Sequence, residues 1–169
     1  NEYFSFILSL DCTKEVVGFA DDIDADLILT HHPVIFNGVK SIKDDTALYS
    51  MIRADIACIS AHTNFDKAQC GINHNLADML ELKDTEQLCN GFVLVGSLDE
   101  PMSMDDFAEL VNQRLDCSGI RYTDTDRIIS RVAVGGGACS EFMWDALAKS
   151  DCFVTGDLKY HEMLDASQA

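Results

Sequence analysis

Short apolar runs that alternate with longer amphipathic segments restrict the fold of this 169-residue chain more than any other feature. Apolar runs bounded by polar or turn residues indicate buried β-strands, and the segments between them have helical spacing. Strands that alternate with helices predict an α/β fold with largely parallel sheets. We expect strands over 6–10, 27–30, 56–59, 92–97, 119–123, 131–135 and 152–155, and helices over 13–22, 44–54, 71–82, 103–115, 140–149 and 158–167.

One pattern occurs twice along the chain. A strand, a helix, an aspartate, a second strand and a threonine follow one another over 7–30 and again over 132–155. Asp26 aligns with Asp151 and Thr30 aligns with Thr155, a constant offset of 125 residues. We therefore expect two similar α/β halves, over 1–90 and 91–169. Because ligands bind at the carboxyl ends of strands in open α/β sheets, the residues just after Thr30 and Thr155 are candidates for function.

Two adjacent histidines end the strand expected over 27–30. Pro33 follows His31 and His32 and stops any regular strand, because proline has no N–H to donate. On a straight strand the two rings would point to opposite faces, so both reach one cluster only if the backbone turns. Neutral imidazole is a common ligand for zinc, iron and other divalent metals. The histidines are therefore metal-ligand candidates, and the alternative is two exposed polar residues that open a loop.

His62 and Asp66 follow the next apolar strand. Asp66 has the carboxylate that bridges two metal ions in many hydrolytic sites, but by itself it fits a loop turn or helix cap equally well. His62 can be a ligand, a residue that orients the ligands, or a satisfied strand-end histidine, and the pattern favours the last two.

The second half offers weaker candidates. Gly135-Gly136-Gly137 lies between a strand and a helix, and it is either a turn that binds a phosphate of the substrate or a tight turn that requires glycine. Its spacing differs from a dinucleotide-binding motif, which favours the structural turn. Asp157 and His161 stand four residues apart on an expected helix, so they pair with each other or face the site. Trp144 is expected to fill the core between helix and sheet. No serine or cysteine nucleophile has a recognisable triad motif, and the catalytic residues stay unassigned.

Composition limits the class of protein and its compartment. The net charge of −17 makes direct nucleic-acid binding unfavourable, because such a surface repels phosphates. The seven cysteines include no C-x-x-C pair, which indicates reduced core thiols. The apolar runs are too short to span a membrane, and the first residues lack the basic segment of a signal peptide. We therefore expect a cytoplasmic protein that does not bind membranes.

Three motifs together resemble the GTP cyclohydrolase I type 2 homologues, also described as Ngg-one-interacting-factor-three-like proteins. The similarity extends from about Ile7 to Ala166, and the order and spacing of the motifs agree. The motifs are Ala25-Asp26-Leu27-Ile28-Leu29-Thr30-His31-His32-Pro33-Val34-Ile35-Phe36, Ala61-His62-Thr63-Asn64-Phe65-Asp66 with Gly71-Ile72-Asn73, and Val154-Thr155-Gly156-Asp157-Leu158-Lys159-Tyr160-His161.

This resemblance implies a homohexameric ring of two-domain α/β subunits with a dinuclear metal site. By the family pattern, His31, His32 and Asp66 are metal ligands, with zinc, iron or manganese as the divalent ion. Residues that support them from outside the ligand shell are expected to be His62, Thr155, Asp157 and His161.

Three family segments have no counterpart in these 169 residues. They are the N-terminal segment with its Trp-Asp-Asn motif, the late His-x-x-x-Glu motif that completes the metal site, and the large regulatory insertion found in some relatives. The resemblance predicts a metal-dependent hydrolase that acts on a small-molecule substrate. The competing hypothesis is a metal-binding scaffold or regulatory protein without enzymatic activity.

Overall fold

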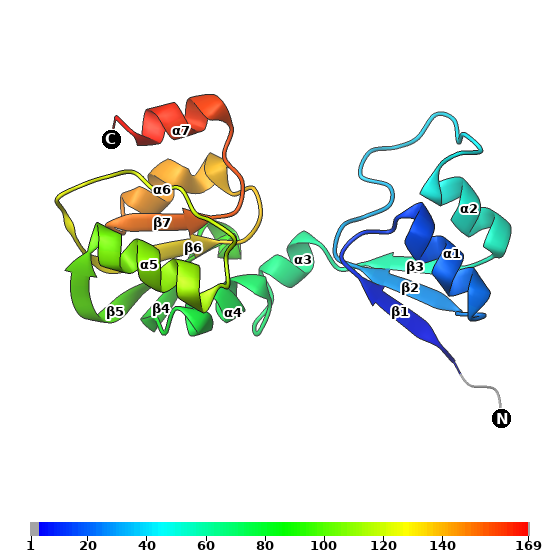
Figure 1. The fold of residues 1–169 in the computed structure, drawn as a ribbon, viewed down its shortest axis with the longest axis horizontal. Helices are drawn as coiled ribbons and strands as arrows, with labels where there is room; N and C mark the ends of the chain where they lie inside the picture. The colour runs from blue at the N-terminus through cyan, green and yellow to red at the C-terminus, as the bar shows by residue number, and fades with distance from the viewer. Residues whose placement is uncertain (1–3, 169) are drawn as a thin grey trace. The chain divides into compact units, whose positions relative to one another are not determined.

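The computed structural model describes residues 4–168. These residues form two compact units, with the boundary between Phe65 and Asp66 (Figure 1). The boundary lies earlier in the chain than the expected division at residue 90. The reason is that the elements over 72–88 pack with the second sheet and not with the first. Among the described residues, no helix combines the length and the apolar character needed to cross a membrane.

The first unit is a three-stranded parallel sheet with helices on one face. Its strand order is β1-β2-β3, with Phe6, Leu27 and Ala57 side by side at the start of the register. Thr13 caps α1, because its hydroxyl accepts the N–H of Val16 at 3.3 Å. The elements are β1 (Phe6–Ser9), α1 (Lys14–Asp22), β2 (Leu27–Thr30), α2 (Ala47–Ala54), β3 (Ala57–Ser60) and the short α3 (Thr63–Asp66) at the unit boundary.

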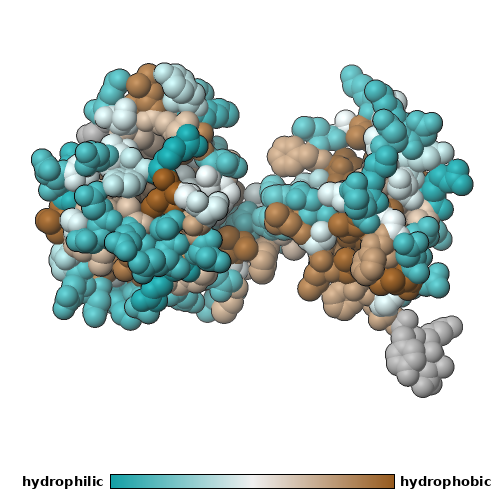
Figure 2. Space-filling view, viewed as in Figure 1, coloured by the Kyte–Doolittle hydropathy of each residue, from teal (hydrophilic) through white to brown (hydrophobic). Residues whose placement is uncertain are grey.

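Helices α1 and α2 both cover the face of this sheet that carries Ile7, Ile28 and Cys58. Strand alternation directs the intervening side chains to the other face, where Leu8 is 69% exposed. Figure 2 shows hydrophobic residues gathered on this part of the first unit. We call it the uncovered face of the first sheet, and its members are Phe6, Leu8, Leu27, Leu29, Ala57 and Ile59.

The second unit has a four-stranded mixed sheet in the order β4-β5-β6-β7. Strands β4, β5 and β6 pair in antiparallel fashion, and only β6 and β7 are parallel. Ser103 caps α5 by accepting the N–H of Asp106 at 3.1 Å. The elements are α4 (Ile72–Met79), β4 (Lys83–Leu88), the 3₁₀ turn η1 (Cys89–Gly91), β5 (Val93–Ser103), α5 (Met104–Arg114), β6 (Ile128–Gly135), the 3₁₀ turn η2 (Ser140–Phe142), α6 (Met143–Leu147), β7 (Cys152–Thr155) and α7 (Tyr160–Ala166).

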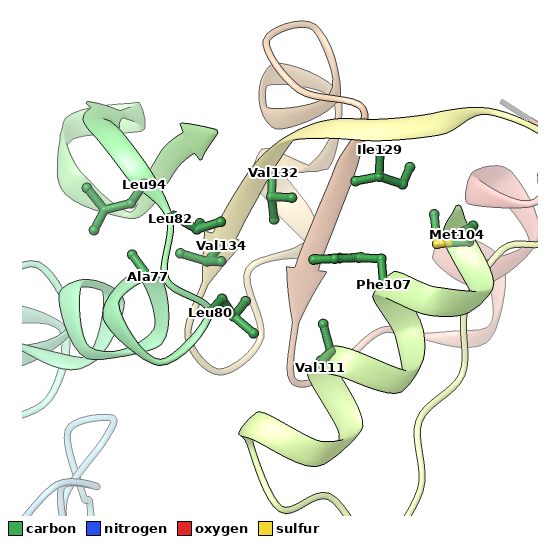
Figure 3. Close-up of a cluster of buried hydrophobic side chains, with 10 residues drawn as sticks. All are labelled: Ala77, Leu80, Leu82, Leu94, Met104, Phe107, Val111, Ile129, Val132 and Val134. Atoms are coloured by element: carbon green, nitrogen blue, oxygen red, sulfur yellow. The ribbon is translucent and has the colours of Figure 1, made fainter. Parts of the chain in front are cut away.

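Buried side chains line both faces of the second sheet. One cluster packs α4 and α5 against the strands, with Phe107 and Val111 from α5 and Val132 from β6 (Figure 3). A second cluster joins Val93, Val95 and Ala133 to Ala146 of α6. The α/β fold class is therefore confirmed. The expectation of largely parallel sheets holds for the first sheet and is wrong for the second, where β5 pairs in antiparallel fashion with both β4 and β6.

The repeated β-α-β pattern has a structural counterpart in each unit. In the first unit the Asp26 carboxylate accepts the N–H of Ser5 at 2.8 Å. In the second the Asp151 carboxylate accepts the N–H of Ser130 at 3.0 Å. Each aspartate therefore joins the start of the second strand to the start of the first.

Two expectations about the second half are wrong. The segment 119–123 forms a loop and not a strand, and the Tyr122 hydroxyl in this loop donates to Asp105 of α5 at 2.7 Å. Trp144 does not fill the core, because its place on the short α6 leaves it 54% exposed. Small residues and phenylalanines close this part of the core, with Ala146 buried and Phe142 stacked on Phe92.

Candidate metal centre

The carboxyl ends of β1, β2 and β3 meet at one edge of the first sheet, because the three strands are parallel. A row of hydroxyl groups, Ser9, Thr30 and Ser60, marks this edge. Thr30 is 2% exposed, and its hydroxyl donates to the carbonyl of His32 at 2.8 Å and lies 2.9 Å from the Ser60 hydroxyl. Hydrogen bonds therefore hold the turn that carries the histidine pair to its own strand, β2, and to the neighbouring strand, β3.

Three histidines gather at this edge. One ring nitrogen from each of His31, His32 and His62 lies within 4.8 Å of the others. The ring centroids of His31 lie 4.9 Å from His32 and 5.2 Å from His62. The turn before Pro33 thus brings both adjacent rings to one cluster. The His32 side chain is 47% exposed, so an ion and a small molecule can reach the cluster from solvent.

Two of the three rings are oriented by hydrogen bonds through Nδ1. The Nδ1 of His31 lies 2.9 Å from the carbonyl oxygen of Ala61, and the Nδ1 of His32 lies 2.8 Å from the Asp11 carboxylate. A carbonyl oxygen only accepts, so the His31 proton sits on Nδ1 and the lone pair on Nε2. This is how metal-ligating histidines are usually held. The donor set, three imidazoles at one point, suits zinc, iron or another transition metal.

Asp66 begins the second unit and ends α3. Within that unit its charge acts on Cys139, where burial first and then the nearby Asp66 carboxylate raise the pKa of the thiol. The expected role of Asp66 as a metal ligand stays a prediction. The histidine cluster lies in the first unit and includes His62, for which the sequence favoured a supporting role or a satisfied strand-end position over a ligand role.

The three supporting residues expected from the second half all lie near β7. The Thr155 hydroxyl and the Asp157 N–H both donate to the carbonyl of Gly137, at 2.9 and 3.2 Å. His161 is largely exposed on α7, where its ring lies 4.0 Å from Glu162. Thr155 and Asp157 thus hold the glycine turn to β7, and the expected support of the metal by all three stays a prediction.

The glycine turn after β6 is held by the buried Asn73, whose role the sequence did not reveal. Asn73 accepts the N–H of Gly136 at 2.8 Å and donates to the carbonyls of Gly91 and Phe92, each at 3.0 Å. A Cβ on Gly136 would lie 2.7 Å from the Ile72 side chain, so glycine is required there by packing. The structure therefore favours the structural interpretation of these glycines over phosphate binding.

Asp11 and Thr30 are site residues that sequence reasoning missed. Thr30 appeared only as part of the repeat, and Asp11 was not singled out. The available signal was topological: residues that follow the end of β1 reach the same edge as residues that follow β2 when the two strands are parallel neighbours. The sequence does not show which strands are neighbours, so the Asp11–His32 contact needs the structure.

The fold and the site together define a class of protein. It has two α/β units, and a histidine cluster lies at the carboxyl edge of the small parallel sheet of the first unit. The chain belongs to the Duf34/NIF3 (NGG1p interacting factor 3) family, whose model matches residues 1–169. It is 34% identical over 175 aligned residues to the GTP cyclohydrolase 1 type 2 homolog of Clostridium perfringens, and this alignment covers 94% of the chain and 66% of the relative.

Solved structures agree with this assignment. The Staphylococcus aureus hypothetical protein SA1388 superposes with a TM-score of 0.86 at 28% identity, which covers 99% of this chain and 71% of that one. A Bacillus cereus protein related to NIF3 gives a TM-score of 0.86 at 25% identity, with 99% and 77% coverage. The chain thus spans about two thirds of the length of the Clostridium perfringens relative.

Proposed function

We propose that this chain is part of a metal-dependent hydrolase whose divalent ions bind at the histidine cluster. The observation that supports this most strongly is the convergence of His31, His32 and His62 within 4.8 Å at the carboxyl edge of a parallel sheet. The proposed ligands are His31 and His32, joined by Asp66 as the family resemblance implies. Two ions per subunit are proposed on the same ground, with zinc, iron or manganese as candidates.

A divalent ion bound there supplies Lewis acidity and an acidified water for hydrolysis. The chain's own residues prepare the site for it. The carbonyl of Ala61 fixes the proton of His31 on Nδ1, and the Thr30 hydroxyl holds the turn by donating to the carbonyl of His32. These contacts orient the site through the protein's own groups, so little reorganisation is needed on ion binding, which favours affinity.

The substrate class comes from the name of the Clostridium perfringens relative, which points to hydrolytic opening of the GTP ring. A shallow cavity of about 410 Å³ beside His32 has room for part of such a ligand, with Pro33 and Val34 on its wall and Lys43 as a cation. The second candidate is a metal-binding scaffold without catalysis, which the uncovered apolar face of the first sheet favours.

Metal binding to purified variants tests the site. His31→Ala should lower Zn²⁺ affinity by at least ~10–100-fold in calorimetric titration, because even the loss of groups that orient ligands costs that much. His74→Ala is the matched control, since His74 lies on α4 of the second unit. Asp66→Ala should also lower the affinity. Unchanged affinity in His31→Ala would reject the site, and unchanged affinity only in Asp66→Ala would reject that ligand.

Activity separates the two candidate functions. Metal-loaded protein is incubated with GTP and with simple phosphate esters, and products are separated by chromatography. Turnover that is lost in His31→Ala supports the hydrolase. Tight metal binding without turnover of either substrate class favours the scaffold.

We also propose that the protein is a cytoplasmic homo-oligomer, a hexamer as the resemblance implies. Among the described residues all seven cysteines are free thiols, which suits a reducing compartment. The uncovered face of the first sheet supports self-association, because parallel sheets are normally covered on both faces.

A further inference from the structure

Asp11 follows the end of β1 and reaches the histidine cluster from the neighbouring strand. We propose that Asp11 is a positioning residue that sets the tautomer and the ring orientation of His32. The basis is one contact, 2.8 Å between an Asp11 carboxylate oxygen and His32 Nδ1. The proposal deepens the metal function proposed above and rests on it only for its effect on affinity.

The contact determines where the His32 proton resides. A carboxylate accepts hydrogen bonds and has no proton to donate, so Nδ1 of His32 must be the donor. In the neutral ring the lone pair then lies on Nε2. Ala61 imposes the same arrangement on His31 through a carbonyl oxygen. Two adjacent histidines therefore present the same nitrogen, although their partners are a side chain in one case and the backbone in the other.

Backbone contacts on both strands hold Asp11 in place for this role. The hydroxyl of Ser9 donates to the carbonyl of Asp11 at 2.9 Å. The N–H of His32 donates to the carbonyl of Leu10 at 2.9 Å, which continues the β1–β2 pairing beyond the ends of the strands. The Asp11 carboxylate and the His32 imidazole thus extend from two backbone segments that are hydrogen-bonded to each other next to the pair. This distinguishes the contact from an accidental meeting of two long surface side chains.

The solvent exposure of Asp11 and His32 indicates that their contact adds little to folding stability. The side chains of His32 and Asp11 are 47% and 55% exposed. Exposed ion pairs of this kind contribute little to folding stability. The effect of Asp11 should therefore appear in the state of His32 and in metal affinity, and hardly in the unfolding midpoint.

The test combines a metal-free measurement with a binding measurement. Long-range ¹H–¹⁵N spectra report which ring nitrogen of each histidine carries the proton. The wild-type protein without metal should show His32 protonated on Nδ1. In Asp11→Ala this proton should shift toward Nε2, and Zn²⁺ affinity should fall ~10–100-fold. In Asp11→Asn the amide oxygen still accepts, so the tautomer should be kept and the affinity loss should be smaller.

Asp22→Asn is the matched control, because it removes the same charge from an exposed position at the end of α1. It should leave both the His32 spectrum and the affinity unchanged. An Asp11→Ala spectrum with His32 still protonated on Nδ1 would overturn the proposal, as would an equal affinity loss in Asp22→Asn. If wild-type protein binds no Zn²⁺ yet the tautomer shifts in Asp11→Ala, the metal function fails while the positioning role of Asp11 stands.

Discussion

The two units contain the same β-α-β pattern but cover their sheets differently. In the second unit, buried clusters lie on both faces of the sheet, with Phe107 on one side and Ala146 on the other. In the first unit, a single small cluster around Ile28 lies under α1 and α2, and the opposite face is uncovered. The second unit thus has a larger core of its own, whereas the first has little core and carries the histidines.

This difference associates folding stability mainly with the second unit and the candidate metal site with the first. Parallel sheets are normally buried on both faces, so the first sheet has fewer packing contacts than its architecture usually provides. Its carboxyl edge is held mainly by polar contacts, such as those of Thr30 and His31. We therefore expect core substitutions in the second unit to change stability strongly and substitutions around the cluster to change binding more than folding.

The largest expected effect is the loss of core packing in the second unit. Phe107 is 1% exposed at the centre of the cluster shown in Figure 3. Phe107→Ala removes a large buried side chain and leaves a cavity, which typically costs about 3–5 kcal/mol. Denaturant unfolding followed by circular dichroism should show a corresponding loss of unfolding free energy.

Phe36→Ala is the control for this comparison, because Phe36 is an exposed phenylalanine in the first unit. Its effect should stay within about 0.5 kcal/mol. Equal losses in the two variants would mean that the burial of Phe107 does not account for the loss of stability.

Strands formed by apolar runs were predictable from sequence, whereas a polar and exposed edge strand was not. The observed β2 and β7 coincide with the expected strands 27–30 and 152–155, because short apolar runs bounded by polar residues define them. Strand β4 was missed because Lys83–Leu88 is almost entirely polar and exposed, as edge strands often are. Its place in the fold comes from pairing with β5, which no local pattern shows.

The candidate site was predictable to the extent that its residues are adjacent in the chain. The consecutive residues His31, His32 and Pro33 form a recognisable motif, and His62 follows the next strand. Asp11 follows a different strand, and the Asn73 side chain accepts from a glycine turn 63 positions away, so neither has a local signal. Long-range partners of this kind depend on strand order and register, which the sequence leaves open.

A smaller effect is expected from alkaline pH, and Cys152 of the second unit shows its origin. Burial, with a further contribution from Asp151, raises the pKa of the Cys152 thiol from 9.0 to about 11. Between these pH values the unfolded chain loses this proton while the folded chain keeps it, so stability falls as pH rises. At ~1.4 kcal/mol per pKa unit, the loss approaches about 2–3 kcal/mol near pH 11.

Unfolding curves at pH 8 and pH 10.5 measure this loss. In Cys152→Ala the decline over that interval should be smaller than in the wild type, because the buried thiol is gone. Cys12→Ala in the first unit should also reduce the decline, because burial first and then the nearby Cys58 raise the pKa of that thiol to about 11 as well. An identical decline in all three proteins would contradict the role of buried thiols.

The smallest expected effect on stability comes from the uncovered face of the first sheet. Leu8→Glu places a charge on this face without removing a buried contact, so the unfolding free energy should change by no more than about 0.5 kcal/mol. The same charge should disrupt packing of a second copy against the face, because a carboxylate buried without a partner is costly. Light scattering at micromolar concentration should therefore show a lower mass than for the wild type.

Phe19→Glu provides the control, because Phe19 is an exposed apolar residue on α1 of the same unit and does not belong to the uncovered face. Its mass should match that of the wild type. If Leu8→Glu keeps the wild-type mass while Phe19→Glu loses it, copies meet through the helical side of the unit and not through the sheet. If all three proteins are monomers, a second copy does not cover the uncovered face, and the contrast between the two sheets has another cause than self-association.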